Sequence, residues 1–167
     1  TREEADKRLG KGKVFGALVA SVGLLPFLPL LGIPARSGGM RFFALRLGQM
    51  RRDERFREWC PHAVVLDGEM IGHAGYHGPP GINAGQIPDA IEIGYTIEEP
   101  WRGNGYATAA ATELLRQAEE RGVRHYVASA TPDNEPSLAI IRKLGFRQTG
   151  EAIDEEDGLE LVFELER

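Results

Sequence analysis

The stretch "EIGYTIEEPWRGNGYATAAATELL", Glu92–Leu115, joins a strand-like run to an alanine-rich helix through a turn with two glycines and an arginine. In the strand-like run, Ile93, Tyr95 and Ile97 alternate with other residues and share one face. Pro100 ends the run, because proline lacks a backbone donor and disfavours helix in the preceding residue. At a helix N-terminus, free N–H groups and the helix dipole favour an anion. The stretch therefore predicts a strand–loop–helix unit that binds a negatively charged ligand.

Two common phosphate-binding loops fit this turn poorly. The Walker loop requires a lysine followed by Ser or Thr, and neither follows Gly105, so that loop is excluded. The dinucleotide fingerprint would place its third small residue at Thr108 and an acidic residue about 20 positions later, where the chain has His125. The turn therefore needs another interpretation.

Outside this stretch the chain alternates between strand and helix patterns only in its middle. We predict a mixed α/β sheet rather than a doubly wound one. Apolar spacing predicts helices over 41–59, 105–121 and 135–144, although Gly48 makes a continuous first helix doubtful. The predicted strands are a hairpin over 62–78, single strands over 90–97 and 123–130, and a final hairpin over 146–167 around an acidic turn.

The composition is that of one ordinary globular domain: 167 residues, 42% hydrophobic and 27% charged. A net charge of −5 argues against a nucleic-acid partner and favours a cationic one. Cys60 is the only cysteine, which excludes an intrachain disulfide and fits a reducing, cytoplasmic location.

The segment Val14–Ile33 contains no charged residue and is long enough for a membrane span. Pro26 and Pro29 interrupt it, and the chain offers no partner helix for the backbone groups that they free. We therefore expect residues 1–61 to be an apolar helical or loop part of the same domain as 62–167, with no membrane partner. A membrane anchor and a contact between two copies in a homodimer are the alternatives.

Two linked motifs point to a family. Arg102, Gly105 and Ala107 match the pattern Arg or Gln, two residues, Gly, one residue, Gly or Ala. The later stretch "DNEPSLAIIRKLGF", 133–146, contains Asn–x–x–Ser and ends in Lys–Leu–Gly–Phe. Together they resemble the pyrophosphate loop and the following helix of the GNAT superfamily of acyl-CoA-dependent N-acetyltransferases. The resemblance covers roughly His62–Arg167.

The resemblance implies a central, mostly antiparallel twisted sheet of about six or seven strands with a splayed parallel pair, flanked by helices. Residues 62–167 would form the acetyl-CoA-binding core, with acetyl-CoA as co-substrate between the splayed strands and no metal ion. The residues implied to bind acetyl-CoA are Ile93, Gly94, Tyr95, Thr96, Ile97, Arg102, Gly103, Asn104, Gly105, Tyr106, Ala107, Asn134 and Ser137.

The resemblance also implies catalytic roles. Glu92 lies on the strand where many members carry the general base. In many members a tyrosine acts as the general acid at the position where this chain has Ile141. Ser137 instead matches the ribosomal-protein N-terminal acetyltransferase-like branch, in which a serine hydrogen-bonds the CoA sulfur; Tyr106 and Tyr126 are alternative acids. Backbone N–H groups around Gly94 and Tyr95 would stabilise the oxyanion.

These features predict an enzyme that transfers acetyl from acetyl-CoA directly to a primary amine, either a protein N-terminus or a small-molecule amine. A catalytically inactive CoA-binding sensor or assembly module is the alternative, favoured by Ile141 and the unusual N-terminal part. The acidic turn Asp154–Asp157 would border the acceptor site. His73 and His77 share a strand face but lie about 13 Å apart, too far to share a metal, so lining a pocket is the role left to them.

Overall fold

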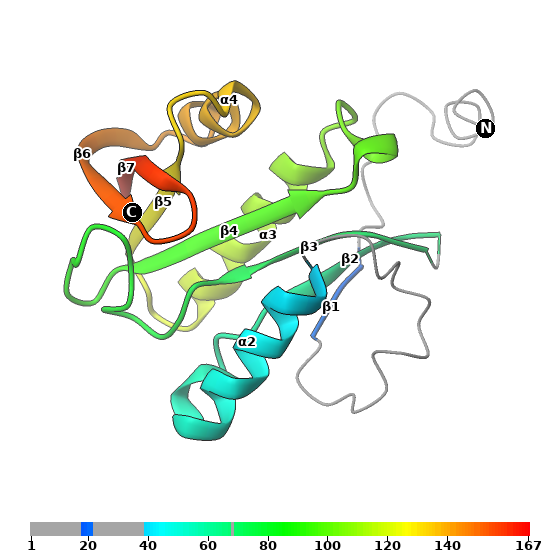
Figure 1. Ribbon diagram of the computed structural model, residues 1–167, viewed down its shortest axis with the longest axis horizontal. Helices are drawn as coiled ribbons and strands as arrows, with labels where there is room; N and C mark the ends of the chain where they lie inside the picture. The colour runs from blue at the N-terminus through cyan, green and yellow to red at the C-terminus, as the bar shows by residue number, and fades with distance from the viewer. Residues whose placement is uncertain (1–17, 22–38, 68) are drawn as a thin grey trace.

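The computed structural model describes residues 18–21, 39–67 and 69–167, which form a seven-stranded sheet in the order β1-β2-β3-β4-β5-β7-β6 (Figure 1). Every neighbouring pair is antiparallel except β4 and β5, which are parallel. This confirms the predicted mixed sheet with one parallel pair. The strands are β1 (Leu18–Ser21), β2 (His62–Leu66), β3 (Glu69–Tyr76), β4 (Ile91–Ile97), β5 (His125–Ala130), β6 (Arg147–Asp154) and β7 (Gly158–Glu166).

The parallel pair is joined only at its start. Ile91 pairs with Tyr126 and Glu92 with Val127, and no later residues of β4 and β5 are paired. Beyond this point the two arrows lead away from each other in Figure 1, with β5 running toward α4 (Glu135–Lys143). The predicted splay is therefore present, and it begins at Glu92.

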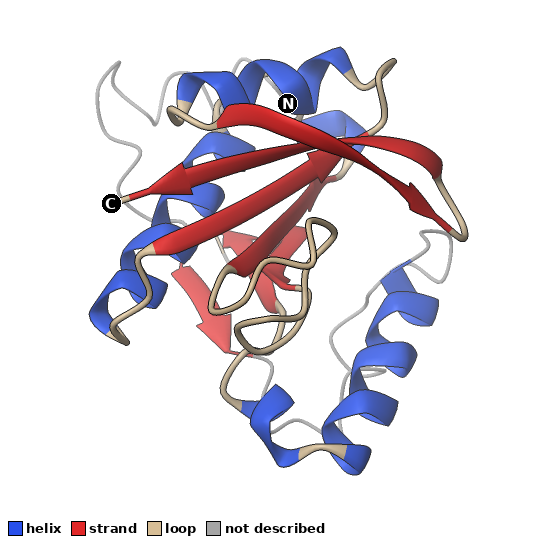
Figure 2. Ribbon diagram, turned by 90° about the vertical axis from the view of Figure 1, so that its left-hand side faces the viewer, coloured by secondary structure: helices blue, strands red, loops and turns tan. Residues whose placement is uncertain are grey.

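Helices α3 (Tyr106–Glu120) and α4 cover the face of the sheet that holds the main core. In α3, Ala111, Leu114, Leu115 and Ala118 are fully buried, as their helical spacing predicts. The buried Tyr76 hydroxyl of β3 donates to the Leu114 carbonyl oxygen at 2.7 Å and ties α3 to the sheet. Helix α2 (Gly39–Arg52) lies on the other side of the sheet (Figure 2).

The predicted helix over 41–59 is in fact two elements. Helix α2 runs through Gly48 and is followed by the 3-10 helix η2 (Glu54–Arg57). The break comes at Asp53, whose carboxylate accepts the Arg55 N–H at 3.0 Å and starts the second element as its N-cap. The doubt about a continuous helix is therefore confirmed, but the break is at Asp53 and not at Gly48.

The expectation of helix or loop in the N-terminal segment is wrong for Leu18–Ser21. These residues form β1, antiparallel to β2, with Leu18 opposite Val65 and Ser21 opposite His62. The edge of β2 offers unpaired N–H and C=O groups, and a short apolar segment satisfies them best as a strand. The rest of Val14–Ile33 lies outside the described residues. Among the residues that are described, none of the helices is both long and apolar enough to cross a membrane.

Candidate active site

A cavity of about 590 Å³ lies between the C-terminal half of β4 and the N-terminal ends of α3 and α4. Ten residues predicted to bind acetyl-CoA line it: Tyr95, Thr96, Ile97, Arg102, Gly103, Gly105, Tyr106, Ala107, Asn134 and Ser137. The predicted Ile93, Gly94 and Asn104 do not line it. Trp101, Thr108, Pro136 and Ile140 line it but were missed; each is within one helical turn of a predicted residue, and that spacing is the signal that could have found them.

The glycine turn holds its shape through backbone conformation. Gly103 and Gly105 have φ values of 74° and 83°, a left-handed region that side chains disfavour. The turn is fastened by Arg102, whose Nε donates to the Ile97 carbonyl oxygen at 2.8 Å, and by Asn104, whose amide donates to the Trp101 carbonyl oxygen at 3.0 Å. Arg102 and Asn104 therefore position the loop.

The N-terminus of α3 is open to a ligand. Its N-cap, Gly105, has no side chain, and within the described part of the chain no side-chain cap bonds to its first-turn N–H groups. The cavity lining carries one cation, Arg102, and no acidic residue among those described. Free N–H groups, a helix dipole and a local absence of carboxylates fit a pyrophosphate such as that of acetyl-CoA.

Helix α4 meets β4 across the cavity. Asn134 is the N-cap of α4, with Oδ1 accepting the Ser137 N–H at 3.3 Å. The Tyr95 hydroxyl lies 3.4 Å from the Ser137 carbonyl oxygen. Burial raises the pKa of Tyr95 to about 12, so its hydroxyl stays protonated over the working range of an enzyme.

Strand register separates the two predicted oxyanion donors. The Glu92 carbonyl oxygen accepts the His77 N–H at 3.0 Å, so the backbone groups of Glu92 face β3. Because backbone groups alternate in direction along a strand, those of Gly94 also face β3 and those of Tyr95 face the splay. An oxyanion donor must point into the splay between β4 and β5. Of the two N–H groups only that of Tyr95 does so, which corrects the expectation for Gly94.

Glu92 lies on the opposite face of β4 from the main core and is 2% exposed. Its Oε1 accepts the Ser129 hydroxyl at 2.8 Å and its Oε2 accepts the Ala84 N–H at 2.7 Å. It is therefore not a solvated glutamate at a strand edge. The hydrogen bonds to both oxygens hold this buried carboxylate in one position.

His77 and Arg46 surround this carboxylate. His77 Nδ1 lies 3.5 Å from Glu92 Oε2. Arg46 of α2, 9% exposed, donates to the His77 carbonyl oxygen and to Gln49 Oε1. Burial lowers the pKa of Arg46, and the negative charge of Glu92 opposes this shift. Sequence reasoning missed Arg46 and Ser129 because nothing local links them to Glu92.

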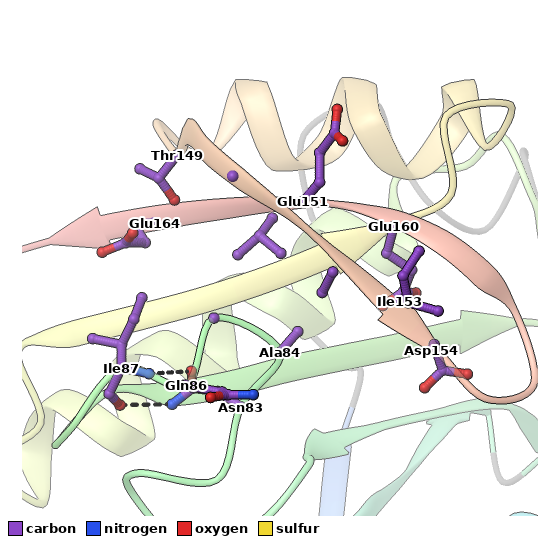
Figure 3. A pocket seen from close by; sticks show the side chains of 14 residues that line it. Asn83, Ala84, Gln86, Ile87, Thr149, Glu151, Ile153, Asp154, Glu160 and Glu164 are labelled. Atoms are coloured by element: carbon purple, nitrogen blue, oxygen red, sulfur yellow. Dashed lines mark hydrogen bonds between the residues drawn. The ribbon is translucent and has the colours of Figure 1, made fainter.

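A second cavity of about 540 Å³ opens between the loop 83–87 and the β6–β7 hairpin (Figure 3). Its lining contains four carboxylates and no basic side chain among the described residues: Glu151, Asp154, Glu160 and Glu164. It adjoins Glu92, because Ala84 lines it and also donates to Glu92. Burial raises the pKa of Glu160, and the nearby charges of Glu92 and Asp154 add to this.

Burial decides the role of Tyr126, one of the two alternative acids. Tyr126 is buried and its hydroxyl donates to the Val123 carbonyl oxygen at 2.8 Å, so it cannot act as an acid in the cavity. Ile141 packs in the main core. Across residues 18–21, 39–67 and 69–167, no group of three or more His, Cys, Asp or Glu side chains is placed to hold a metal ion.

The profile of the family described as "Acetyltransferase (GNAT) domain" matches residues 36–147. This chain belongs to the GNAT acetyltransferase family. The predicted resemblance is confirmed, and the match extends N-terminal to the region where the sequence motifs lie. Members of this family use acetyl-CoA, the ligand that ten residues of the first cavity were predicted to bind.

A curated relative is also named as an N-acetyltransferase. The chain is 33% identical over 92 residues to the putative ribosomal N-acetyltransferase YdaF of Bacillus subtilis, covering 54% of this chain and 48% of that protein. The chain thus spans about half or less of the length of the curated relatives that it matches.

Solved structures confirm the fold. A ribosomal-protein-alanine N-acetyltransferase from Brucella melitensis matches with a TM-score of 0.59 and 22% identity, over 77% of this chain and 78% of that one. The ribosomal L7/L12 α-N-protein acetyltransferase RimL, in complex with coenzyme A, matches with a TM-score of 0.60 and 20% identity, over 75% and 70% of the two chains.

Proposed function

We propose that this protein is an N-acetyltransferase that transfers the acetyl group of acetyl-CoA directly to a primary amine, the N-terminus of a protein or peptide. The observation that carries the proposal is the cavity at the open N-terminus of α3, beside the unpaired half of β4. Residues 1–61 belong to the same domain in this proposal, which the pairing of β1 with β2 supports. With Cys60 as the only cysteine, we place the enzyme in the cytoplasm.

The cofactor side of the site would use backbone groups more than side chains. The N–H groups of 103–107 would hold the pyrophosphate, and the splay-facing backbone of Tyr95 and Ile97 would pair with the pantetheine arm. The Arg102 side chain is engaged with the Ile97 carbonyl oxygen and would shape the loop. The Ser137 hydroxyl would hydrogen-bond the sulfur.

The acceptor would approach from the opposite face, where Glu92 and the acidic cavity lie. The lining carboxylates Asp154 and Glu160 attract a cationic amine and repel the CoA phosphates, so the two substrates are directed to different faces of β4. Relatives and similar structures named as ribosomal-protein N-acetyltransferases favour a protein N-terminus over a small-molecule amine.

Direct transfer requires an amine that loses a proton as it forms the C–N bond, and a thiolate that leaves as the C–S bond breaks. The Glu92 site would receive the proton, and the Tyr95 N–H would stabilise the developing oxyanion. Because thiolate is a good leaving group, a serine hydrogen bond in place of a tyrosine acid at Ile141 is sufficient.

Calorimetric titration with acetyl-CoA, with dephospho-CoA alongside, tests the cofactor site. Mass spectrometry of a panel of peptides with free N-termini, and of the same peptides with blocked N-termini, tests the reaction. We expect one-to-one binding and a single acetyl group on free N-termini only. Binding without transfer to any peptide or to a polyamine panel would identify an inactive CoA-binding module, and no binding would remove the glycine turn from the site.

A further inference from the structure

His77 lies beside Glu92, close to the point where β4 and β5 separate. It follows β3 directly, and its ring lies over Gly94 of β4, just beyond the last paired residue Glu92. A Cβ atom built on Gly94 would stand 2.8 Å from His77 Nε2 and 3.3 Å from Cδ2. The absence of a side chain at position 94 therefore lets the imidazole lie against the strand where the splay opens.

Glu92 itself is poorly suited to accept a proton from a substrate. It is 2% exposed, and both of its oxygens already accept hydrogen bonds, from Ser129 and from Ala84. Both oxygens are therefore already engaged and shielded from solvent. His77 has 42% of its side-chain surface exposed and touches the same carboxylate, so it is the member of the pair that a substrate can reach.

The geometry points to His77 as the general base of the acetyl transfer, with Glu92 as the positioning residue that orients its ring. This inference rests on the proposed function. Glu92 Oε2 lies 3.5 Å from Nδ1 and would accept Nδ1–H, which leaves the Nε2 lone pair free over Gly94. Such contacts are commonly long before substrate binds and then tighten.

The proton balance is simple. A cationic amine first loses one proton to solvent and attacks as the neutral amine. Its nitrogen then forms the C–N bond and gives a second proton to Nε2, while the C–S bond breaks. The departing thiolate gains a proton from solvent, and the imidazolium returns its proton to solvent through its exposed edge. No oxidant, metal or further reactant is needed.

The charged groups around the imidazole support a neutral ring at neutral pH. Burial lowers the pKa of His77 from its ordinary value of 6.5, and Arg46 of α2 lowers it further, while Glu92 of β4 and Asp154 of β6 oppose this. A base of this kind is unprotonated at pH 7 and stays functional to a lower pH than an ordinary histidine would.

The test compares pH–rate profiles of kcat/KM for His77→Gln and Glu92→Gln, with His73→Gln as the matched control on the same strand. We expect His77→Gln to lower kcat by about a hundredfold or more and to remove the acidic limb, with acetyl-CoA binding unchanged. Glu92→Gln should keep the limb but move it to lower pH, because the carboxylate raises the His77 pKa. His73→Gln should keep both rate and limb.

Two further measurements test the inference if His77→Gln or Glu92→Gln folds poorly. Gly94→Ala should cause a similar loss with His77 still present, because the new methyl displaces the ring. NMR titration of the His77 ring, with no substrate present, should show a pKa below 6.5 that falls further in Glu92→Gln.

Loss of the limb in Glu92→Gln but not in His77→Gln would make Glu92 the base and overturn the inference, as would a limb that survives in both variants. Wild-type enzyme without transfer activity would instead refute the proposed function, and the NMR result would still report on the pair.

Discussion

The Tyr95 hydroxyl on β4 lies 3.4 Å from the Ser137 carbonyl oxygen at the start of α4, so the two walls of the cofactor cavity meet through this contact. A bond of this length is weak. It nevertheless links β4 to α4 beside the cofactor cavity. Ser137 and Tyr95 both line the cavity in which we place the thioester.

Replacing Ser137 by alanine should lower kcat by about tenfold, because one hydrogen bond to a developing thiolate is worth about 1.5 kcal/mol. Tyr95→Phe should lower kcat/KM less than this and leave the pH profile unchanged below pH 10, because the Tyr95 pKa of about 12 keeps the hydroxyl protonated there. Steady-state kinetics checks both. A larger effect from Tyr95→Phe would assign the acid to Tyr95 in place of Ser137.

Gly105→Val should raise the KM for acetyl-CoA sharply. Gly105 has a φ of 83° at the N-terminus of α3, and a β-branched residue would distort the N–H groups that face the cavity. Gly122→Val is the matched control, because Gly122 has a φ of 88° just beyond the other end of α3. At both sites, no described residue lies within 4 Å of an added Cβ.

Both variants should lose about 1–2 kcal/mol of stability from backbone strain, measured by urea unfolding. Only Gly105→Val should lose cofactor affinity. An equal KM change in Gly122→Val would show that the effect is one of stability and not of the site.

Tyr126→Phe should cost about 1 kcal/mol of stability and leave kcat unchanged, because its hydroxyl is buried and bonded to the Val123 carbonyl oxygen. Tyr76→Phe, which removes a similar buried bond to Leu114, serves as the comparison. Thermal unfolding and turnover are measured for both. A loss of turnover confined to Tyr126→Phe would return this residue to the list of acids.

Stability should fall as pH drops below about 6.5. Burial lowers the pKa values of His62, His73 and His77 below 6.5, so the unfolded chain binds more protons than the folded one in this range. The slope can reach about 1.4 kcal/mol per pH unit for each histidine. Urea unfolding at pH 7.5 and pH 5.5 measures it, and His62→Gln should reduce it. A stability that is constant over this range would contradict the burial of these rings.

The cofactor loop could be predicted from sequence because its parts are contiguous. Arg102, Gly105 and Ala107 follow one strand and open one helix, so the chain itself brings the backbone groups together. The same holds for Asn134 and Ser137, a cap and the third residue of its helix. Local dihedral preferences and helix geometry decide such sites, and both can be read along the chain.

The surroundings of Glu92 were decided by tertiary structure alone. His77 follows β3, Ser129 lies near the end of β5, and strand register brings both to the Glu92 carboxylate. Packing of α2 brings Arg46 to the His77 carbonyl oxygen. Sequence placed Glu92 on the correct strand but did not predict that the preceding loop folds back so that the Ala84 N–H donates to the carboxylate. Long-range contacts of this kind leave no periodic pattern, because each partner satisfies a local rule of its own. The sequence by itself therefore predicted the loop at which we propose that the anion binds, and the tertiary structure decided which groups surround Glu92.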